Sequence, residues 1–185
     1  MPKIIDNLHE KIFECSLKLF GEYGYNEVNM KRIAKELDIA VGTLYNYYPN
    51  KQDLFFTVLK KSWQQTFFKL DKVKETNYSS RKKLKYSIKI LYDEIENRKG
   101  LGKELTKANV IKKESLDGIK DRLDGIIRNL VEELKKEEKI DIDKEIEERL
   151  IRVFFLSVID MLDKYAKEKE NNIKFINYII DCNFK

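Results

Sequence analysis

The sequence has few of the residues that interrupt regular structure. Only two prolines and seven glycines occur in 185 residues, whereas 37% of the residues are charged and 42% are hydrophobic. Because proline and glycine mark most turns and helix ends, their shortage argues against a protein rich in loops or short strands. Charged and hydrophobic residues in these proportions favour long amphipathic helices. We therefore predict an all-α fold of about nine helices.

Cysteine and histidine are also scarce, which argues against several kinds of site. Cys15 and Cys182 do not form a disulfide framework, and Cys15 lies on the apolar face of a predicted helix, as a buried thiol would. His9 is the only histidine and has no partner with which to hold a metal ion. One histidine placed so early supports no Ser-His-Asp or Cys-His set. We expect no metal site, no cofactor, no catalytic residues and no enzymatic activity.

Long hydrophobic runs are absent as well. No apolar run approaches the ~20 residues that span a membrane. The richest window, residues 150–162, is interrupted by Arg152, Ser157 and Asp160. Residues 1–20 carry lysine and glutamate throughout, which is unlike the apolar centre of a signal peptide. We expect no membrane partner and a cytoplasmic location.

The formal net charge of +5 suits a polyanionic partner, but its distribution does not locate one. Residues 1–55 hold seven Lys and Arg against eight Asp and Glu, a balance of −1. Within residues 28–51 the balance is four basic against two acidic residues, or +2. Any affinity for nucleic acid in this region must therefore come from a few individually placed groups.

Apolar residues recur at spacings of three and four along most of the chain, as in amphipathic helices. Gly24, Asn29, Asn50 with Asp53, and Asp143 supply the expected caps at helix ends. The predicted helices cover about 3–23, 30–37, 41–48, 51–73, 84–95, 103–113, 116–134, 144–169 and 172–183.

Residues 29–51 have the pattern of a helix-turn-helix. Asp38 occupies the turn, where a left-handed conformation is expected, and Pro49 ends the second helix. Ala34 is the small residue that allows two helices to cross closely. Gly42 near the start of the second helix lets the backbone approach a phosphate. The apolar positions are Ile33, Ala34, Leu37, Ile39 and Leu44, and the outward positions are Thr43, Tyr45, Asn46, Tyr47 and Lys51.

From Leu19 to Leu54 the sequence resembles the TetR family of transcriptional regulators. The matching residues are Leu19, Phe20, Gly24, Tyr25, Ile33, Ala34, Ile39, Gly42, Thr43, Leu44, Tyr45, Tyr47, Tyr48, Lys51 and Leu54. Asp38, Asn29 and Tyr48 are mild departures from the commonest family pattern. Ala40 is a larger departure, because the family often has a Ser or Thr there that bonds a phosphate. After about residue 67 the resemblance extends only to helical character and length.

The resemblance implies a homodimer that binds a near-palindromic stretch of double-stranded DNA. The second helix of each subunit would enter the major groove, with half-sites about one helical turn, ~34 Å, apart. Thr43, Asn46 and Tyr47 are the candidates for base edges. Tyr45, Lys51 and the helix N-termini near Asn29 and Lys51 are the candidates for phosphates. The full set of expected DNA-binding residues is Asn29, Lys31, Ala40, Gly42, Thr43, Tyr45, Asn46, Tyr47 and Lys51.

The resemblance further implies two domains, a DNA-binding domain at 6–66 and an effector-binding and dimerisation domain at 67–185. An unidentified small apolar or amphipathic effector would bind the second domain and change the spacing of the two reading heads. The possible lining residues are Trp63, Phe67, Phe68, Tyr86 and Tyr92. These aromatic residues are equally well explained as ordinary core.

The last two predicted helices are apolar on more than one side, which favours burial against a second subunit. The expected dimer residues are Phe154, Phe155, Val158, Leu162, Phe175, Ile176 and Ile179. Alternatively, these helices complete the core of a single chain. We interpret the protein as a ligand-released repressor. The alternative is a structural or cell-organising protein that binds DNA with the same fold and without an effector.

Overall fold

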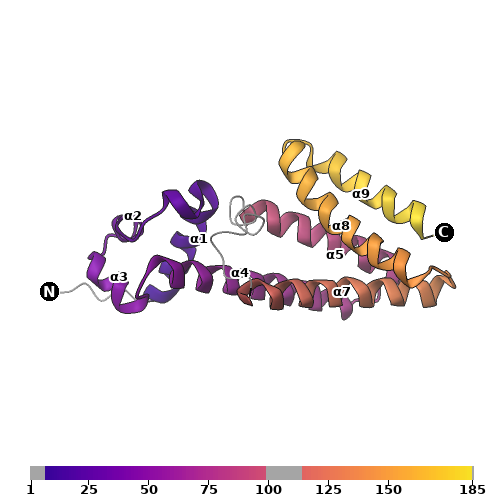
Figure 1. Ribbon diagram of the computed structural model, residues 1–185, viewed down its shortest axis with the longest axis horizontal. Coiled ribbons are helices and arrows are strands. Elements are labelled where there is room, and N and C mark those ends of the chain that lie inside the picture. The colour runs from indigo at the N-terminus through magenta and orange to yellow at the C-terminus, as the bar shows by residue number, and fades with distance from the viewer. Residues whose placement is uncertain (1–6, 99–113, 185) are drawn as a thin grey trace. The chain divides into compact units, whose positions relative to one another are not determined.

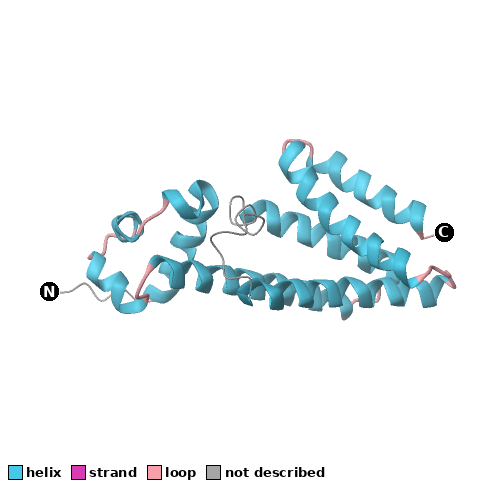
Figure 2. Ribbon diagram, in the orientation of Figure 1, coloured by secondary structure: helices cyan, strands magenta, loops and turns pink. Residues whose placement is uncertain are grey.

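A computed structural model of the chain describes residues 7–98 and 114–184, with the backbone alone at 114–117. Every regular element in these ranges is a helix, and no strand occurs in them (Figures 1 and 2). The predicted all-α fold is thus confirmed, while the predicted helix at 103–113 lies outside the described residues. The helices are α1 (Leu8–Glu27), α2 (Met30–Glu36), α3 (Val41–Tyr47), α4 (Lys51–Lys74), α5 (Ser80–Arg98), α7 (Glu114–Glu138), α8 (Lys144–Lys164) and α9 (Lys169–Asn183).

Contacts divide the chain into two compact units. Unit 1 comprises Met1–Gln65 and Asn97–Leu116, and unit 2 comprises Thr66–Glu96 and Asp117–Lys185. The helices α4, α5 and α7 each contribute residues to both units.

The core of unit 1 is built from one buried face of each of α1 to α4. Ala34 is fully buried, consistent with a close approach of a neighbouring helix that only a small side chain permits. The rings of Phe20 and Phe55 meet edge to face at 5.1 Å, an arrangement that adds to the burial of both side chains. The remaining large members of this core are Ile12, Leu19, Ile33, Leu44 and Leu54.

The end of α1 departs from helical geometry at Gly24. Its φ of 78° and ψ of 168° interrupt the helical dihedrals, although the helix assignment continues to Glu27. Glycine adopts this positive φ without the steric penalty that a Cβ atom would bring. Gly24, predicted as the cap of a helix ending at Tyr23, thus has the positive φ expected of a cap, but the helix resumes after it and ends at Glu27.

Unit 2 buries apolar faces of α4, α5, α7, α8 and α9 against one another. Within it, α8 and α9 pack side by side (Figure 1). Tyr92, Phe154 and Phe184 are among its largest fully buried side chains. Asn172 is also buried, and its side-chain amide donates to the Tyr92 hydroxyl at 2.9 Å and to the Tyr165 carbonyl at 2.8 Å.

Two predicted helix ends, the end of α8 and the start of α9, are wrong. We expected α8 to run to residue 169 and α9 to begin at Asn172. Instead α8 ends at Lys164 and α9 begins at Lys169. Asn172, predicted as the first residue of the last helix, is instead an internal residue of α9, and its amide satisfies a buried hydroxyl on α5 and a carbonyl at the preceding turn.

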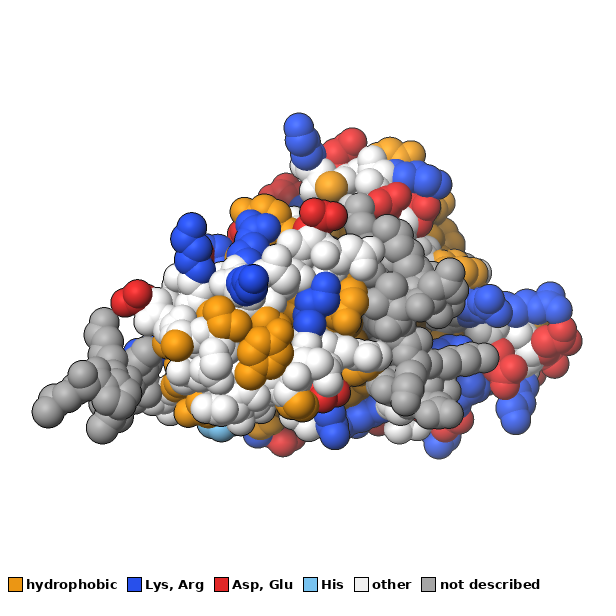
Figure 3. Space-filling model, turned by 60° about the vertical axis from the view of Figure 1, so that its left-hand side comes forward, with side chains coloured by type: hydrophobic (Ala, Val, Ile, Leu, Met, Phe, Trp, Pro, Cys, Tyr) orange, Lys and Arg blue, Asp and Glu red, His pale blue; other side chains and the backbone are white. Residues whose placement is uncertain are grey.

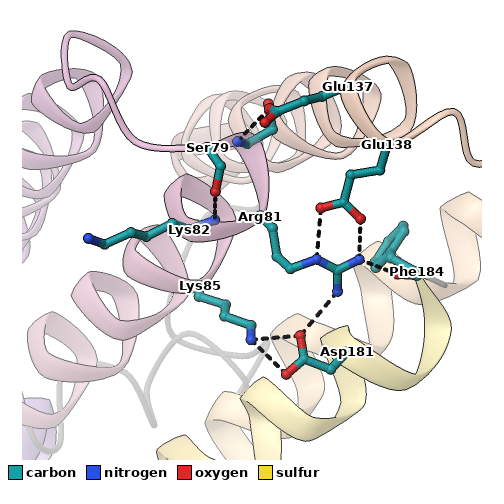
Figure 4. A network of polar contacts seen from close by, with 9 residues as sticks. Ser79, Arg81, Lys82, Lys85, Glu137, Glu138, Asp181 and Phe184 are labelled. Atoms are coloured by element: carbon teal, nitrogen blue, oxygen red, sulfur yellow. Dashed lines mark hydrogen bonds and ion pairs between the residues drawn. The ribbon is translucent and has the colours of Figure 1, made fainter.

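The end of α9 is fixed by a group of residues that we call the Arg81 cluster: Arg81, Lys85, Glu138, Asp181 and the carbonyl of Phe184 (Figure 4). The Arg81 guanidinium donates to both carboxylate oxygens of Glu138, to Asp181 at 3.0 Å and to the Phe184 carbonyl. Lys85 donates to Asp181 at 2.6 Å. These groups come from the start of α5, the end of α7 and the end of α9, so the cluster joins three helix ends within unit 2.

Candidate nucleic-acid interface

The helix-turn-helix begins at a side-chain cap. Asn29 has extended dihedrals, and its side-chain oxygen accepts a hydrogen bond from the backbone N–H of Arg32 at 2.9 Å. This bond satisfies one of the N–H groups that the first turn of a helix leaves without a partner. The cap predicted from the sequence is therefore present, and the carboxamide oxygen of Asn29 faces α2.

The turn between α2 and α3 depends on a left-handed residue, as predicted. Asp38 has a φ of 53°, and the N–H of Ile39 donates to the Ala34 carbonyl at 3.0 Å. Ala40 then takes extended dihedrals before α3, and its side chain makes no cap hydrogen bond. The N–H of Thr43 donates to the Ala40 carbonyl at 2.9 Å. The first turn of α3 is thus closed by main-chain bonds alone.

One face of α3 is open to solvent. Tyr45, Asn46 and Tyr47 are exposed, with Tyr45 at 47% and Tyr47 at 37%, whereas Leu44 is fully buried beneath them. A Cβ atom built on Gly42 would meet nothing within 4 Å. The outward direction predicted for Tyr45, Asn46 and Tyr47 is therefore the one that the helix adopts, and a backbone approach at Gly42 is unobstructed.

The other predicted DNA-facing residues differ in exposure. Lys31 on α2 is exposed, and Thr43 on α3 is only half-buried. In the view of Figure 3, hydrophobic and basic side chains are interspersed on unit 1, with few acidic ones among them. On the face drawn there, the described basic side chains form no continuous stripe, in agreement with the weak charge balance of this region.

Lys51 has an intrachain role that the sequence did not reveal. Its ammonium nitrogen donates to the Tyr25 carbonyl at 2.8 Å and lies 4.2 Å from the centre of the Tyr25 ring. Burial raises the pKa of Tyr25, so the ring beneath Lys51 is a neutral phenol. An ammonium has three N–H donors, so one bond to Tyr25 leaves donors for a phosphate.

The start of α4 is closed by a reciprocal pair. The N–H of Asp53 donates to the Asn50 side-chain oxygen at 2.9 Å, and the Asn50 side-chain amide donates to the Asp53 carboxylate at 2.9 Å. The capping-box-like pair predicted from the sequence is confirmed, with a side-chain amide in place of the usual backbone N–H.

Two further aromatic contacts of unit 1 had no sequence signal. The Arg32 guanidinium on α2 lies 3.6 Å over the Tyr23 ring of α1. His9 near the start of α1 meets Tyr47 at the end of α3, with ring centres 4.5 Å apart. Each pair joins residues of two different helices, so no pattern within one helix could identify them.

The five predicted effector residues do not surround one space. Trp63, Phe67 and Tyr92 are buried, whereas Phe68 is 65% and Tyr86 is 46% exposed. Trp63 belongs to unit 1, and the other four belong to unit 2. Trp63 and Phe67 lie beneath the guanidinium groups of Arg98 and Arg122, each at 4.3 Å.

Unit 2 instead contains a small apolar cavity of about 10 Å³ among α5, α7 and α8, and none of the five predicted residues lines it. A volume of this size is near that of a single water molecule. Its lining consists of Ile88, Leu91, Ile95, Ile127, Phe154, Phe155 and Val158.

The predicted dimer residues also fall into two groups, which differ in how far they are buried. Phe154, Val158 and Ile176 are buried within unit 2, so these three pack inside their own chain. Phe155, Leu162 and Ile179 are half-buried, and Phe175 is 47% exposed. Exposed apolar side chains lie beside them on the same helices, namely Ile146, Val153, Leu156, Ile159 and Tyr178.

Cys15 is half-buried on α1. Burial, together with the nearby Glu36 carboxylate, raises the pKa of its thiol to about 11, so it stays protonated at neutral pH. Among the described residues, no group of three or more His, Cys, Asp or Glu side chains is placed to hold a metal ion. None of the described helices is both long enough and apolar enough to cross a membrane.

Comparison with known proteins finds similarity in the region of the helix-turn-helix and in the overall fold. The family model described as bacterial regulatory proteins, tetR family, matches residues 12–58. The uncharacterized HTH-type transcriptional regulator YuxN of Bacillus subtilis is 34% identical over 88 residues, which cover 48% of this chain and 30% of YuxN. An HTH-type transcriptional regulator of Staphylococcus aureus is 34% identical over 90 residues, which cover 48% of this chain and 49% of that protein. The match thus spans about half or less of these relatives.

Solved structures match more of the chain at lower identity. A TetR transcriptional regulator from Legionella pneumophila has a TM-score of 0.80 at 17% identity and covers 99% of this chain and 100% of its own. The regulator FadR from Bacillus subtilis, solved in complex with stearoyl-CoA, has a TM-score of 0.74 at 17% identity and covers 96% and 98%. At these identities the likeness establishes the fold. Residues 12–58 thus match the family model of bacterial regulatory proteins, tetR family, and the chain as a whole has the fold of these regulators.

Proposed function

We propose that the protein is a sequence-specific DNA-binding transcriptional regulator. The observation that carries this proposal is the open face of α3, where Tyr45, Asn46 and Tyr47 project beyond the buried Leu44. An exposed helix of this kind fits the major groove, where amide and hydroxyl groups bond base edges. The capped start of α2 and the left-handed Asp38 hold this helix in place.

We propose that the working form is a homodimer on a palindromic operator. One reading unit with a balance of only +2 over residues 28–51 offers few phosphate contacts, so two linked units are needed for useful affinity. The partner-facing surface is the exposed apolar face of α8 and α9 formed by Val153, Leu156, Ile159, Phe175 and Tyr178, which we call the α8–α9 face. Its occupant is a second copy of this chain, because a symmetric pair matches a palindrome.

We propose that an apolar or amphipathic ligand releases the dimer from DNA, which makes the protein a repressor. The cavity among α5, α7 and α8 is lined only by hydrocarbon side chains, which suits an acyl chain. FadR, a structural neighbour, was solved with stearoyl-CoA. A cavity of about 10 Å³ must expand to admit such a molecule, so binding would favour a rearranged state of unit 2.

The same small volume favours the alternative function, a DNA-organising protein without an effector. The two functions differ in whether an acyl ligand weakens operator binding. Titration of the protein–operator complex with stearoyl-CoA and with coenzyme A alone separates them. Release by stearoyl-CoA only supports the repressor, and unchanged binding with both compounds supports the alternative.

DNA recognition itself is tested by selecting duplexes from a random pool with the purified protein. The affinity for the selected duplex should exceed that for a scrambled duplex by at least about a thousandfold. Asn46→Ala should lower this discrimination by about 1–3 kcal/mol. Asn129→Ala, which changes an exposed asparagine on α7, is the matched control and should leave it unchanged. Equal affinity of the wild-type protein for both duplexes would refute the proposed function.

A further inference from the structure

The first turn of α1 touches the last turn of the proposed reading helix. His9 and Tyr47 have ring centres 4.5 Å apart and an interplanar angle of 79°, an edge-to-face pair. A second tyrosine, Tyr48, lies 6.5 Å from the same imidazole at 80°. The imidazole thus borders both tyrosines that end this helical segment.

The position of His9 is itself fixed by its neighbours on α1. Lys61 on α4 forms an ion pair with Glu10, and its ammonium lies 4.2 Å from the centre of the Phe13 ring. Glu10 follows His9 directly, and Phe13 lies one turn later. These contacts hold the first turn of α1 against α4, so the imidazole is presented from a braced backbone.

Tyr47 needs such support because its ring is 37% exposed at the end of a seven-residue helix. An exposed tyrosine with no neighbour samples several rotamers, and binding must then order it at an entropic cost. An edge-to-face partner favours one rotamer before DNA arrives. The lower entropic cost strengthens binding only to a duplex that Tyr47 contacts specifically.

We propose that His9 is a positioning residue that holds the Tyr47 ring in the orientation used for base recognition. This inference rests on the proposed function. It assigns sequence discrimination to a residue outside the helix-turn-helix, and it ascribes the effect to the imidazole ring as a packing surface. The competing role for His9 is a direct hydrogen bond to a phosphate.

Three substitutions separate these roles. His9→Phe keeps a ring and loses the hydrogen-bonding nitrogens, His9→Gln keeps hydrogen bonding and loses the ring, and His9→Ala loses both. Binding is measured for the selected duplex and for a scrambled duplex, and thermal unfolding confirms that each variant is folded. Positioning predicts a two- to tenfold loss of discrimination, on the order of the strength of an aromatic pair, in His9→Ala and His9→Gln. His9→Phe should retain most of the discrimination.

A double-mutant cycle with Tyr47→Ala supplies a second readout. In the Tyr47→Ala background, His9→Ala should cause no further loss of discrimination, because the ring that it positions is gone. The inference is overturned if His9→Gln behaves as wild type while His9→Phe does not, or if His9→Ala weakens both duplexes equally. It is also overturned if His9→Ala has the same effect in both backgrounds. Failure of the wild-type protein to discriminate would instead refute the proposed function.

Discussion

Asp38 shows how a single backbone angle supports the helix-turn-helix. Its φ of 53° lies in the left-handed region, where a residue with a Cβ atom loses about 1–2 kcal/mol and glycine loses little. Asp38→Ala and Asp38→Gly both remove the carboxylate. The two variants therefore differ mainly in the free-energy cost of the left-handed backbone conformation. We expect the alanine variant to be less stable than the glycine variant by about 1 kcal/mol in urea unfolding. Equal stabilities would mean that the turn relaxes to another conformation.

Asn29 acts through one hydrogen bond to the Arg32 N–H. Asn29→Ala should lower the free energy of unfolding by about 1 kcal/mol, the usual effect of losing a helix cap. Asn29→Ser, which keeps an acceptor oxygen, is the control and should lose much less. Chemical denaturation of the three proteins checks the prediction, and a similar loss in both variants would contradict a capping role.

Lys51 combines a structural contact with a proposed phosphate contact. Lys51→Ala removes the bond to the Tyr25 carbonyl, so we expect modest destabilisation of unit 1. If the ammonium also neutralises a phosphate, the variant should weaken binding to all duplexes and reduce the salt slope by about one. Affinity measured across a range of salt concentrations distinguishes the two roles. An unchanged slope in a folded variant would leave only the structural one.

At the scale of elements, the Arg81 cluster makes the packing of α9 sensitive to acid. Hydrogen bonds from Lys85 and then Arg81 hold the pKa of Asp181 below its ordinary value, against the opposing effect of burial. The hydrogen bond from Arg81 lowers the pKa of Glu138 in the same way. A carboxylate with a depressed folded-state pKa stabilises the fold above its unfolded pKa of about 4, and this contribution is lost as the pH falls through the folded value.

Wild-type stability should therefore decline from about pH 5 downward, and Asp181→Asn should decline less over the same interval. Thermal unfolding at a series of pH values measures both slopes. The charged groups of the Arg81 cluster are partly exposed. About 1 M salt should therefore reduce the difference in pH dependence between the wild-type protein and Asp181→Asn. Parallel pH profiles would show that the cluster contributes no acid sensitivity.

The sequence predicted elements best where a local residue marks each boundary. Asn29, Asp38 and Asn50 act on neighbours within a few residues, and the structure places all three as expected. The start of the last helix was mispredicted at Asn172, whose bond to a tyrosine hydroxyl 80 positions away in the sequence has no local signal. The contact between Lys51 and Tyr25 has the same origin, since the sequence shows both residues but not their proximity.

At the scale of the whole molecule, the α8–α9 face is the proposed contact through which two copies of unit 1 act together on DNA. Leu156 is 54% exposed on this face and makes no contribution to the buried core. Leu156→Glu should leave the chain folded, convert the proposed dimer to a monomer and reduce operator affinity by at least about tenfold through loss of the second site.

Sedimentation equilibrium and operator binding test the two parts of this prediction together. Lys144→Glu, an exposed substitution at the start of α8, is the control and should remain dimeric. A wild-type protein that is monomeric at micromolar concentration would remove the basis for this face. A folded Leu156→Glu dimer with normal affinity would place the interface elsewhere.

The chain contains one tryptophan, and Trp63 lies buried in unit 1 with the Arg98 guanidinium 4.3 Å over its ring. Unit 2 therefore has tyrosine but no tryptophan. Selective excitation of indole fluorescence consequently reports on unit 1 alone, whereas circular dichroism follows the helices of both units. Comparison of the two signals during denaturation reveals whether unit 1 unfolds with the rest of the chain or before it, without any introduced label.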